Sequence, residues 1–196
     1  MAQAKQSKMK VSKAREFAKE ELEKFLGLLN DELCLRGITG ELCVVGGAAM
    51  VLAFGSRAST RDIDALVLAP SSVRDAARKV AEEHGLPPSW LNDGVKGFAA
   101  DHPLEAKELM KLSNLRVVAP SPEYILAMKC VSARLGVDEH DREDAKFLIK
   151  HLGLRDAGSA VAVVEKYYKA SRIPAKTQYF IQDICNELYP KTQDIS

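Results

Sequence analysis

The sequence predicts an α+β fold, in which a mixed sheet with flanking helices is followed by a helical lobe. Two observations carry this prediction. Up to residue 118, short apolar runs bounded by glycine and polar residues alternate with amphipathic stretches, which is typical of buried strands between helices. Beyond Pro120, only helical patterns remain. We therefore divide the chain into a basic mobile tail (1–11), an α+β lobe (12–119) and a helical lobe (120–196).

The composition excludes several classes of protein. The chain has 196 residues, of which 46% are hydrophobic, and a net charge of +1. It is therefore neither a disordered chain nor a uniformly basic nucleic-acid binder. The charge is uneven, because residues 1–19 carry six basic side chains and one acidic one, a net charge of +5, and the rest then sums to −4. The basic tail either guides a polyanion toward the body of the protein or only keeps the chain in solution.

The expected location is the cytoplasm, with no membrane partner. No apolar run approaches the roughly 18 residues that cross a bilayer, and no apolar segment follows the basic start as in a secretory signal. No two of the four cysteines form a Cys-x-x-Cys motif. We therefore expect reduced, buried thiols rather than a zinc site or a disulfide framework.

The α+β lobe begins with an expected helix and continues with two strands. Ser12 can cap the helix, Phe17 belongs to its apolar stripe, and Gly37 ends it after about Arg36. The apolar run over 42–45 then predicts a buried strand that stops at a double glycine. The next elements are a short helix over 48–54, a loop over 56–60 and a second strand over 63–68.

Residues typical of helix starts and helix ends divide the rest of the chain into elements. Residues 89–114 are the least regular part and predict a short helix near Trp90, itself a packing anchor, with one or two edge strands. The run over 115–118 predicts a further strand. Ser121-Pro122-Glu123 combines a cap, a proline at the first helical position and an acid in the first turn, so a helix begins there. The expected helices span about 73–84, 122–135, 139–151, 157–170 and 175–188.

The residues that indicate chemistry surround the second strand. Because side chains alternate along a strand, Asp62 and Asp64 point to the same side, with Ile63 toward the core. Two carboxylates so close repel each other, and a divalent cation such as Mg²⁺ or Mn²⁺ removes that penalty. Gly46 and Gly47 let backbone N–H groups approach a phosphate, and the helix that starts there adds its positive end. This combination is typical of phosphoryl or nucleotidyl transfer.

The run GGAAMVLAFGSRASTRDIDALV over 46–67 resembles the signature of the DNA polymerase β-type nucleotidyltransferase superfamily. The order Arg-x-x-Thr-x-Asp-x-Asp within it resembles the AbiEii-like branch, known from abortive-infection and toxin–antitoxin systems. The run YILAMK over 124–129 and the later Asp-x-x-Asp are similar to that branch as well. LPPSWLND over 86–93 resembles a group of uncharacterised bacterial nucleotidyltransferase-like proteins. The resemblance covers roughly residues 40–190.

The resemblance implies a nucleotidyltransferase-like fold and an enzyme that moves a nucleoside monophosphate from a nucleoside triphosphate to an acceptor. The acceptor would be RNA such as tRNA, a protein or a small molecule. The role would be toxin-like or that of a cognate partner protein in a two-gene system. By position, Asp62 and Asp64 would bind catalytic magnesium ions, and Gly46 and Gly47 would contact the triphosphate.

The resemblance also implies supporting residues. Arg57 and Thr60 would orient a phosphate or stabilise the loop, and Lys129 would reach a phosphate from the helical lobe. Each has a purely structural alternative. Arg57 could pair with an acidic surface residue, and Lys129 could extend its amine from an apolar helix to solvent. Arg134 and Asp144 could support the site or form a structural ion pair between helices.

The sequence departs from the superfamily pattern in two places. Many members carry serine where this chain has Gly47, and active members usually carry a third carboxylate on a neighbouring central strand, which 115–118 does not supply. Candidates for the missing acid are Asp93, Asp101, Glu105 and Glu108. The alternative function is therefore a degenerate fold that binds nucleotide, RNA or a partner protein without turnover. A basic group near Tyr167 and Tyr168 is either an RNA contact or a solvated helix face; it consists of Lys166, Lys169, Arg172 and Lys176.

Overall fold

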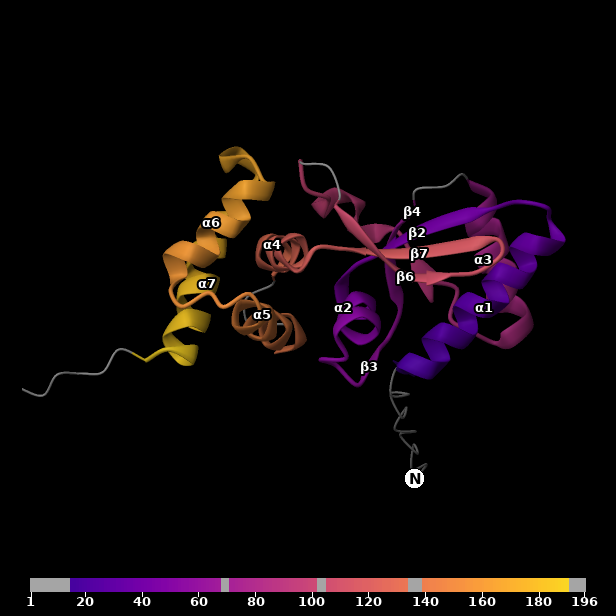
Figure 1. The fold of residues 1–196 in the computed structure, drawn as a ribbon, viewed down its shortest axis with the longest axis horizontal. Coiled ribbons are helices and arrows are strands. Elements are labelled where there is room, and N and C mark those ends of the chain that lie inside the picture. The colour runs from indigo at the N-terminus through magenta and orange to yellow at the C-terminus, as the bar shows by residue number, and fades with distance from the viewer. Residues whose placement is uncertain (1–14, 68–70, 102–104, 134–138, 191–196) are drawn as a thin grey trace, which may run out of the picture.

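A mixed sheet forms the centre of the α+β part of the molecule (Figure 1). The computed structural model describes residues 15–67, 71–101, 105–133 and 139–190. Strand β2 is central, antiparallel to β4 on one side and parallel to β7 on the other. The sheet order is β5 (Leu91–Asn92), β4 (Ile63–Val67), β2 (Gly40–Val44), β7 (Leu115–Pro120) and β6 (Ala106–Lys111). The predicted α+β fold with a mixed sheet is confirmed.

Helices flank the sheet and extend the molecule beyond one end of it. In Figure 1, α1 (Lys19–Leu35) and α3 (Ser71–His84) lie together on the right, and α4 (Pro122–Ser132) follows directly from β7. The helices that follow α4 in the chain gather on the left; they are α5 (Glu139–His151), α6 (Ala157–Tyr167) and α7 (Ala175–Leu188). Buried apolar side chains of the sheet and of α4 to α7 belong to one continuous core cluster. The division at residue 120 stays a prediction.

The start of α1 differs from the prediction. Ser12 and the tail 1–11 lie outside the described residues, and Phe17 lies in strand β1 (Phe17–Ala18) instead of on the helix. This strand pairs with β3 (Ser59–Thr60), a strand within the stretch expected to be a loop. The Ala18 N–H donates to the Glu21 carboxylate at 3.2 Å, which satisfies one donor at the start of the helix. Pairing and capping together move the helix start to Lys19.

The ends of other helices also differ from the predicted ones. Helix α2 (Gly46–Ala49) starts two residues earlier than predicted and continues as a π-helical turn (Met50–Phe54). Gly55 ends it in the left-handed region, with φ of +58°. Helix α6 ends at Tyr167 rather than near residue 170, because Tyr168 is extended. Trp90 is 1% exposed and its indole N–H donates to the Ala77 carbonyl at 2.9 Å, so its packing role is confirmed.

The irregular region after Trp90 contains strand β5, a 3₁₀ helix η2 (Gly94–Phe98) and the edge strand β6. This agrees with the expected short helix and edge strands. A second 3₁₀ turn, η3 (Ala170–Arg172), precedes α7.

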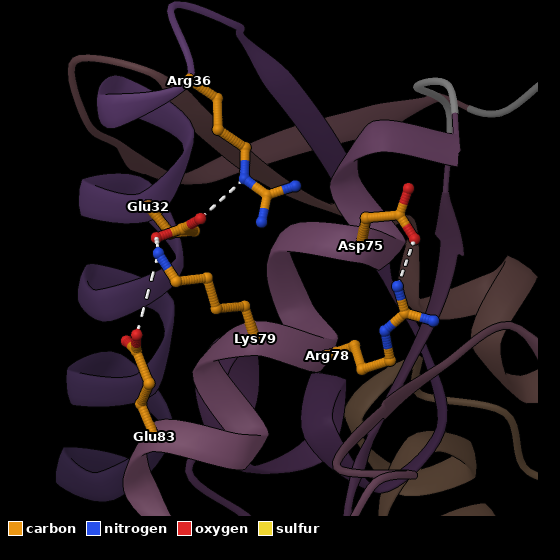
Figure 2. A network of polar contacts seen from close by, with 6 residues as sticks. All are labelled: Glu32, Arg36, Asp75, Arg78, Lys79 and Glu83. Atoms are coloured by element: carbon orange, nitrogen blue, oxygen red, sulfur yellow. Dashed lines mark hydrogen bonds and ion pairs between the residues drawn. The ribbon is translucent and has the colours of Figure 1, made fainter.

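A buried carboxylate links α1 to α3 away from the candidate site (Figure 2). Glu32 lies between Arg36, at 2.6 Å, and Lys79, at 2.9 Å, and Lys79 also approaches Glu83. Hydrogen bonds from Lys79 and Arg36 hold the pKa of Glu32 below its usual range. The pairing fixes α1 and α3 to each other.

Three of the four cysteine thiols are buried. Cys43, Cys130 and Cys185 are buried free thiols, whereas Cys34 is exposed, so the expectation of a buried thiol was wrong there. Cys34 lies in the last turn of α1, on a side that none of the other described elements covers. In the described part of the chain, no helix combines the length and the apolar character that a membrane span needs.

Candidate active site

The end of β2, the start of β4 and helix α4 border one cavity of about 290 Å³. Gly46 and Gly47 reach it from the start of α2, directly after β2. Asp62 reaches it from the residue before β4, Asp64 from β4 itself, and Lys129 from α4. The Val45 N–H donates to the Asp64 carbonyl at 2.9 Å, which brings the double glycine beside the two aspartates. The antiparallel pairing of β2 with β4 thus assembles residues that the sequence separates.

The two aspartates lie on the cavity side of β4, and Ile63 between them is fully buried on the other side. This agrees with the alternation expected from the sequence. Burial raises the pKa of Asp62, and the amide of Asn92 opposes that change by donating to the Asp62 carboxylate at 3.1 Å. Burial, followed by the negative charge of Asp62, raises the pKa of Asp64 to about 6. Both carboxylates are therefore in an environment that favours a bound cation.

The double glycine is required by close contacts on both sides. Gly46 has φ of +59°, and a Cβ placed there would lie 2.7 Å from the Asp64 Oδ2. A Cβ on Gly47 would overlap the Thr60 hydroxyl and lie 3.1 Å from the Arg57 guanidinium. Serine, which many superfamily members carry at this position, would not fit here unless Thr60 moved. Both glycines also line the cavity, so part of the backbone of this turn faces the space that a ligand would occupy.

A buried cation lies on the opposite wall. The Lys129 side chain is 8% exposed, and its Nζ lies 2.7 Å from Asp141 and 2.7 Å from Asp144, both on α5. Burial lowers the pKa of Lys129, but these two carboxylates outweigh it and raise the pKa above its usual value. The alternative in which Lys129 extends to solvent was therefore wrong. Sequence reasoning did not identify Asp141 as a partner.

Arg57 and Thr60 both line the cavity next to Gly47. Arg57 also approaches Asp144 at 3.5 Å, so it does have an acidic partner, although that partner is buried rather than on the surface. Arg134 lies outside the described residues, and its pairing with Asp144 stays a prediction. Asp144 instead contacts Lys129 and Arg57, and so joins the two walls of the cavity.

The family described as "Nucleotidyltransferase of unknown function (DUF6036)" has a model that matches residues 23–156. The chain belongs to this family. The match covers more than half of the chain and includes the candidate site residues from Gly46 to Asp144. This match confirms the resemblance to nucleotidyltransferases. It does not confirm the assignment to the AbiEii-like branch. No curated protein and no solved structure matches the chain.

The neighbouring strand β5 places an amide, and not a third carboxylate, beside the two aspartates. Strand β5 runs parallel to β4 with Asn92 opposite Asp64, so Asn92 is the polar residue that a neighbouring strand places beside the pair. Its Nδ2 donates to Asp62, and its Oδ1 accepts the Gly94 N–H at 3.1 Å. The run LPPSWLND contained this residue, but only the strand pairing shows its location.

The acids proposed as third carboxylates lie elsewhere, and none of them lines the cavity. Asp93 pairs with Arg74 at 2.7 Å and with Lys96 at 2.6 Å. Asp101, Glu105 and Glu108 are on other surfaces, where Asp101 pairs with Arg172 and Glu108 with Arg116. In the described ranges, no group of three or more histidine, cysteine or acidic side chains is placed to hold a metal ion.

The basic group near the C-terminus is partly used inside the protein. Arg172 donates to the carbonyls of Gly97 and Ala99, and the Lys176 amine donates to the Ala133 carbonyl. Lys166 lies over the Tyr167 ring at 5.1 Å. The simple interpretation of these side chains as a solvated face was therefore wrong for Arg172 and Lys176.

Proposed function

We propose that this protein is a magnesium-dependent nucleotidyltransferase that moves a nucleoside monophosphate from a nucleoside triphosphate to an acceptor. The observation that carries the proposal is the shared cavity, which Asp62 and Asp64 line together with Gly46 and Gly47, and in which Asp64 lies directly beside Gly46. Membership of a nucleotidyltransferase family supports the same activity.

The donor set fits Mg²⁺, or Mn²⁺ in its place. Mg²⁺ is commonly bound through one or two carboxylates, with water and substrate phosphate oxygens in the other positions. Asp62 and Asp64 would hold the ion, and their raised pKa values show the burial and repulsion that a cation would offset. When bound, the ion would neutralise charge on the phosphates during an in-line displacement.

The residues of the chain would bind and orient the substrate. The Gly46-Gly47 backbone would contact the triphosphate, with Arg57 and Thr60 beside it. Lys129 would place positive charge on the far side of the phosphates, although it shares that charge with Asp141 and Asp144. The acceptor oxygen would attack the α-phosphorus and form the new P–O bond, and pyrophosphate would leave.

The acceptor we propose is RNA, including tRNA, with a protein side chain or a small molecule as alternatives. The proposal includes an AbiEii-like, toxin-like role in the cytoplasm, for which the supporting residues are Arg57, Thr60, Asp62 and Asp64 in their characteristic order. The basic residues 1–19 would attract a polyanionic acceptor.

Label transfer tests the proposal. The protein is incubated with Mg²⁺, each α-labelled nucleoside triphosphate, and total RNA or protein. We expect label on an acceptor, and its loss in Asp62→Asn and Asp64→Asn. Asp75→Asn is the matched control, because Asp75 is an exposed aspartate on α3 outside the cavity. If the double variant Asp62→Asn/Asp64→Asn binds and transfers nucleotide as the parent does, the proposal is wrong.

A second function is favoured by Asn92, which stands where an acid would complete the catalytic group. In that case the fold binds nucleotide, RNA or a cognate toxin–antitoxin partner without turnover. Nucleotide binding without label transfer to any acceptor would support this alternative. Asn92→Asp then provides a direct comparison, since it restores a carboxylate beside Asp62 and Asp64 and should create transfer activity.

A further inference from the structure

The candidate active-site cavity is lined by two chemically different sets of residues. The polar set, called its polar half below, contains the double glycine, the aspartates and the cations described above, together with Thr60, Arg61, Ser132, His140 and Asp141. Its other half is apolar and is formed by side chains from η2 and α4, namely Val95, Phe98, Ile125 and Met128. A ligand that fills both halves must therefore combine a charged end with an apolar one.

Phe98 is unusual among the apolar side chains of this protein. It is 40% exposed, although large apolar side chains of the described chain are mostly buried. Leu35 and Tyr179 are exposed to a greater degree, but neither of them borders the cavity. An exposed apolar side chain on the wall of a cavity is typical of a ligand-binding surface.

The segment that carries Phe98 is held firmly. The Phe98 carbonyl accepts a hydrogen bond from the Tyr168 hydroxyl. The Arg172 guanidinium donates to the Gly97 carbonyl at 3.1 Å and to the Ala99 carbonyl at 3.0 Å. Arg172 therefore bonds to both sides of Phe98 along the chain and keeps this wall in place.

Further bonds anchor the end of the same segment to the C-terminal helices. Arg172 pairs with Asp101 at 2.8 Å, and the Asp101 N–H donates to the Tyr167 carbonyl at 3.0 Å. The Ala100 N–H donates to the Tyr124 hydroxyl at 2.9 Å. So many bonds to one short segment indicate a preorganised wall, which binds a ligand without first having to be ordered.

We propose that Phe98 is the surface on which the base of the bound nucleotide stacks, and that Arg172 is the residue that positions it. The inference rests on the proposed function, since the triphosphate must occupy the polar half for the base to reach the apolar one. Stacking on an aromatic ring tolerates every base, because each base has a π-face. The four apolar side chains themselves offer no hydrogen bonds to a base edge, so the stacking contact accepts the nucleoside triphosphates as a class.

Calorimetric binding of five ligands to the full chain in Mg²⁺ tests this inference. The ligands are ATP, GTP, CTP, UTP and inorganic tripolyphosphate, which has the phosphates without the base. Phe98→Ala should weaken all four nucleotides by about 5- to 100-fold, the range of base stacking on an aromatic side chain. Its affinity for tripolyphosphate should stay at the parent value, and Phe98→Trp should retain nucleotide binding. Tyr179→Ala, which removes another exposed aromatic side chain, should change nothing.

Arg172 is tested in the same way. Arg172→Met should weaken the nucleotides but not tripolyphosphate, and Arg172→Lys should recover part of the loss. Parent-like nucleotide affinity in Phe98→Ala would overturn the stacking role and leave the proposed function standing. An equal loss of tripolyphosphate affinity would also overturn it, because the whole cavity would then have changed. If the parent chain binds neither nucleotide nor tripolyphosphate, the proposed function itself fails.

Discussion

Replacing Asp64 by asparagine should stabilise the protein at neutral pH while it removes a proposed metal ligand. The cause is the burial of Asp64 beside Asp62, which raises its pKa from 3.8 to about 6. The folded protein therefore binds more protons at this site than the unfolded chain between about pH 4 and pH 6. The contribution of Asp64 to the stability of the parent must fall as the pH rises through this interval. Asparagine has the same shape and carries no charge, so the variant does not share this loss.

The size of the effect follows from the shift of about two pKa units. Each unit corresponds to about 1.4 kcal/mol of unfolding free energy, so the full difference is about 3 kcal/mol above pH 7. Partial solvent access to the cavity makes this an upper value. At pH 4, where Asp64 is protonated in the folded state, the two proteins should have similar stability.

Urea unfolding in EDTA between pH 4 and pH 8 measures this difference. The matched control is Asp75→Asn, which removes an exposed carboxylate whose partner Arg78 is also exposed, and which should change stability by less than about 0.5 kcal/mol. A gain in Asp64→Asn that is the same at every pH, or a loss at pH 8, would refute the reasoning from burial. Excess Mg²⁺ with nucleotide should then stabilise the parent more than the variant.

Substitutions at two positions test the walls of the cavity, and a third position away from it provides a control. Lys129→Met should destabilise the protein by about 3–5 kcal/mol in urea unfolding, because Asp144 stays buried without its close cation. Lys129→Met/Asp144→Leu should recover most of the loss. A double variant that is no more stable than Lys129→Met would contradict this prediction. Gly47→Ala should weaken nucleotide binding by roughly tenfold or more in calorimetry, because its Cβ overlaps the Thr60 hydroxyl. Gly27→Ala is its control on α1, where a Cβ meets nothing within 4 Å, and should raise stability by about 1 kcal/mol without changing binding.

The elements that the sequence predicted well are those with local causes. The strand before the double glycine, the alternation of Asp62 with Ile63, and the helix that Ser121 begins all follow from neighbouring residues. The Ser121 hydroxyl accepts the Tyr124 N–H at 3.3 Å, as expected of a helix cap. The first helix was predicted too long, because a two-residue strand pairing at Phe17 replaced its first turns.

By itself, the sequence determined the fold class, the motif and the order of its residues, because helix caps, strand alternation and glycine turns depend on near neighbours in the chain. Only the tertiary structure decided what lies around Asp62 and Asp64. Asn92 is 30 residues from Asp62, and Arg57 is 87 residues from Asp144. Such pairs form through strand register and helix packing, which no local pattern specifies. For the same reason, the apolar wall at Phe98, held by Arg172, became visible only in the folded chain.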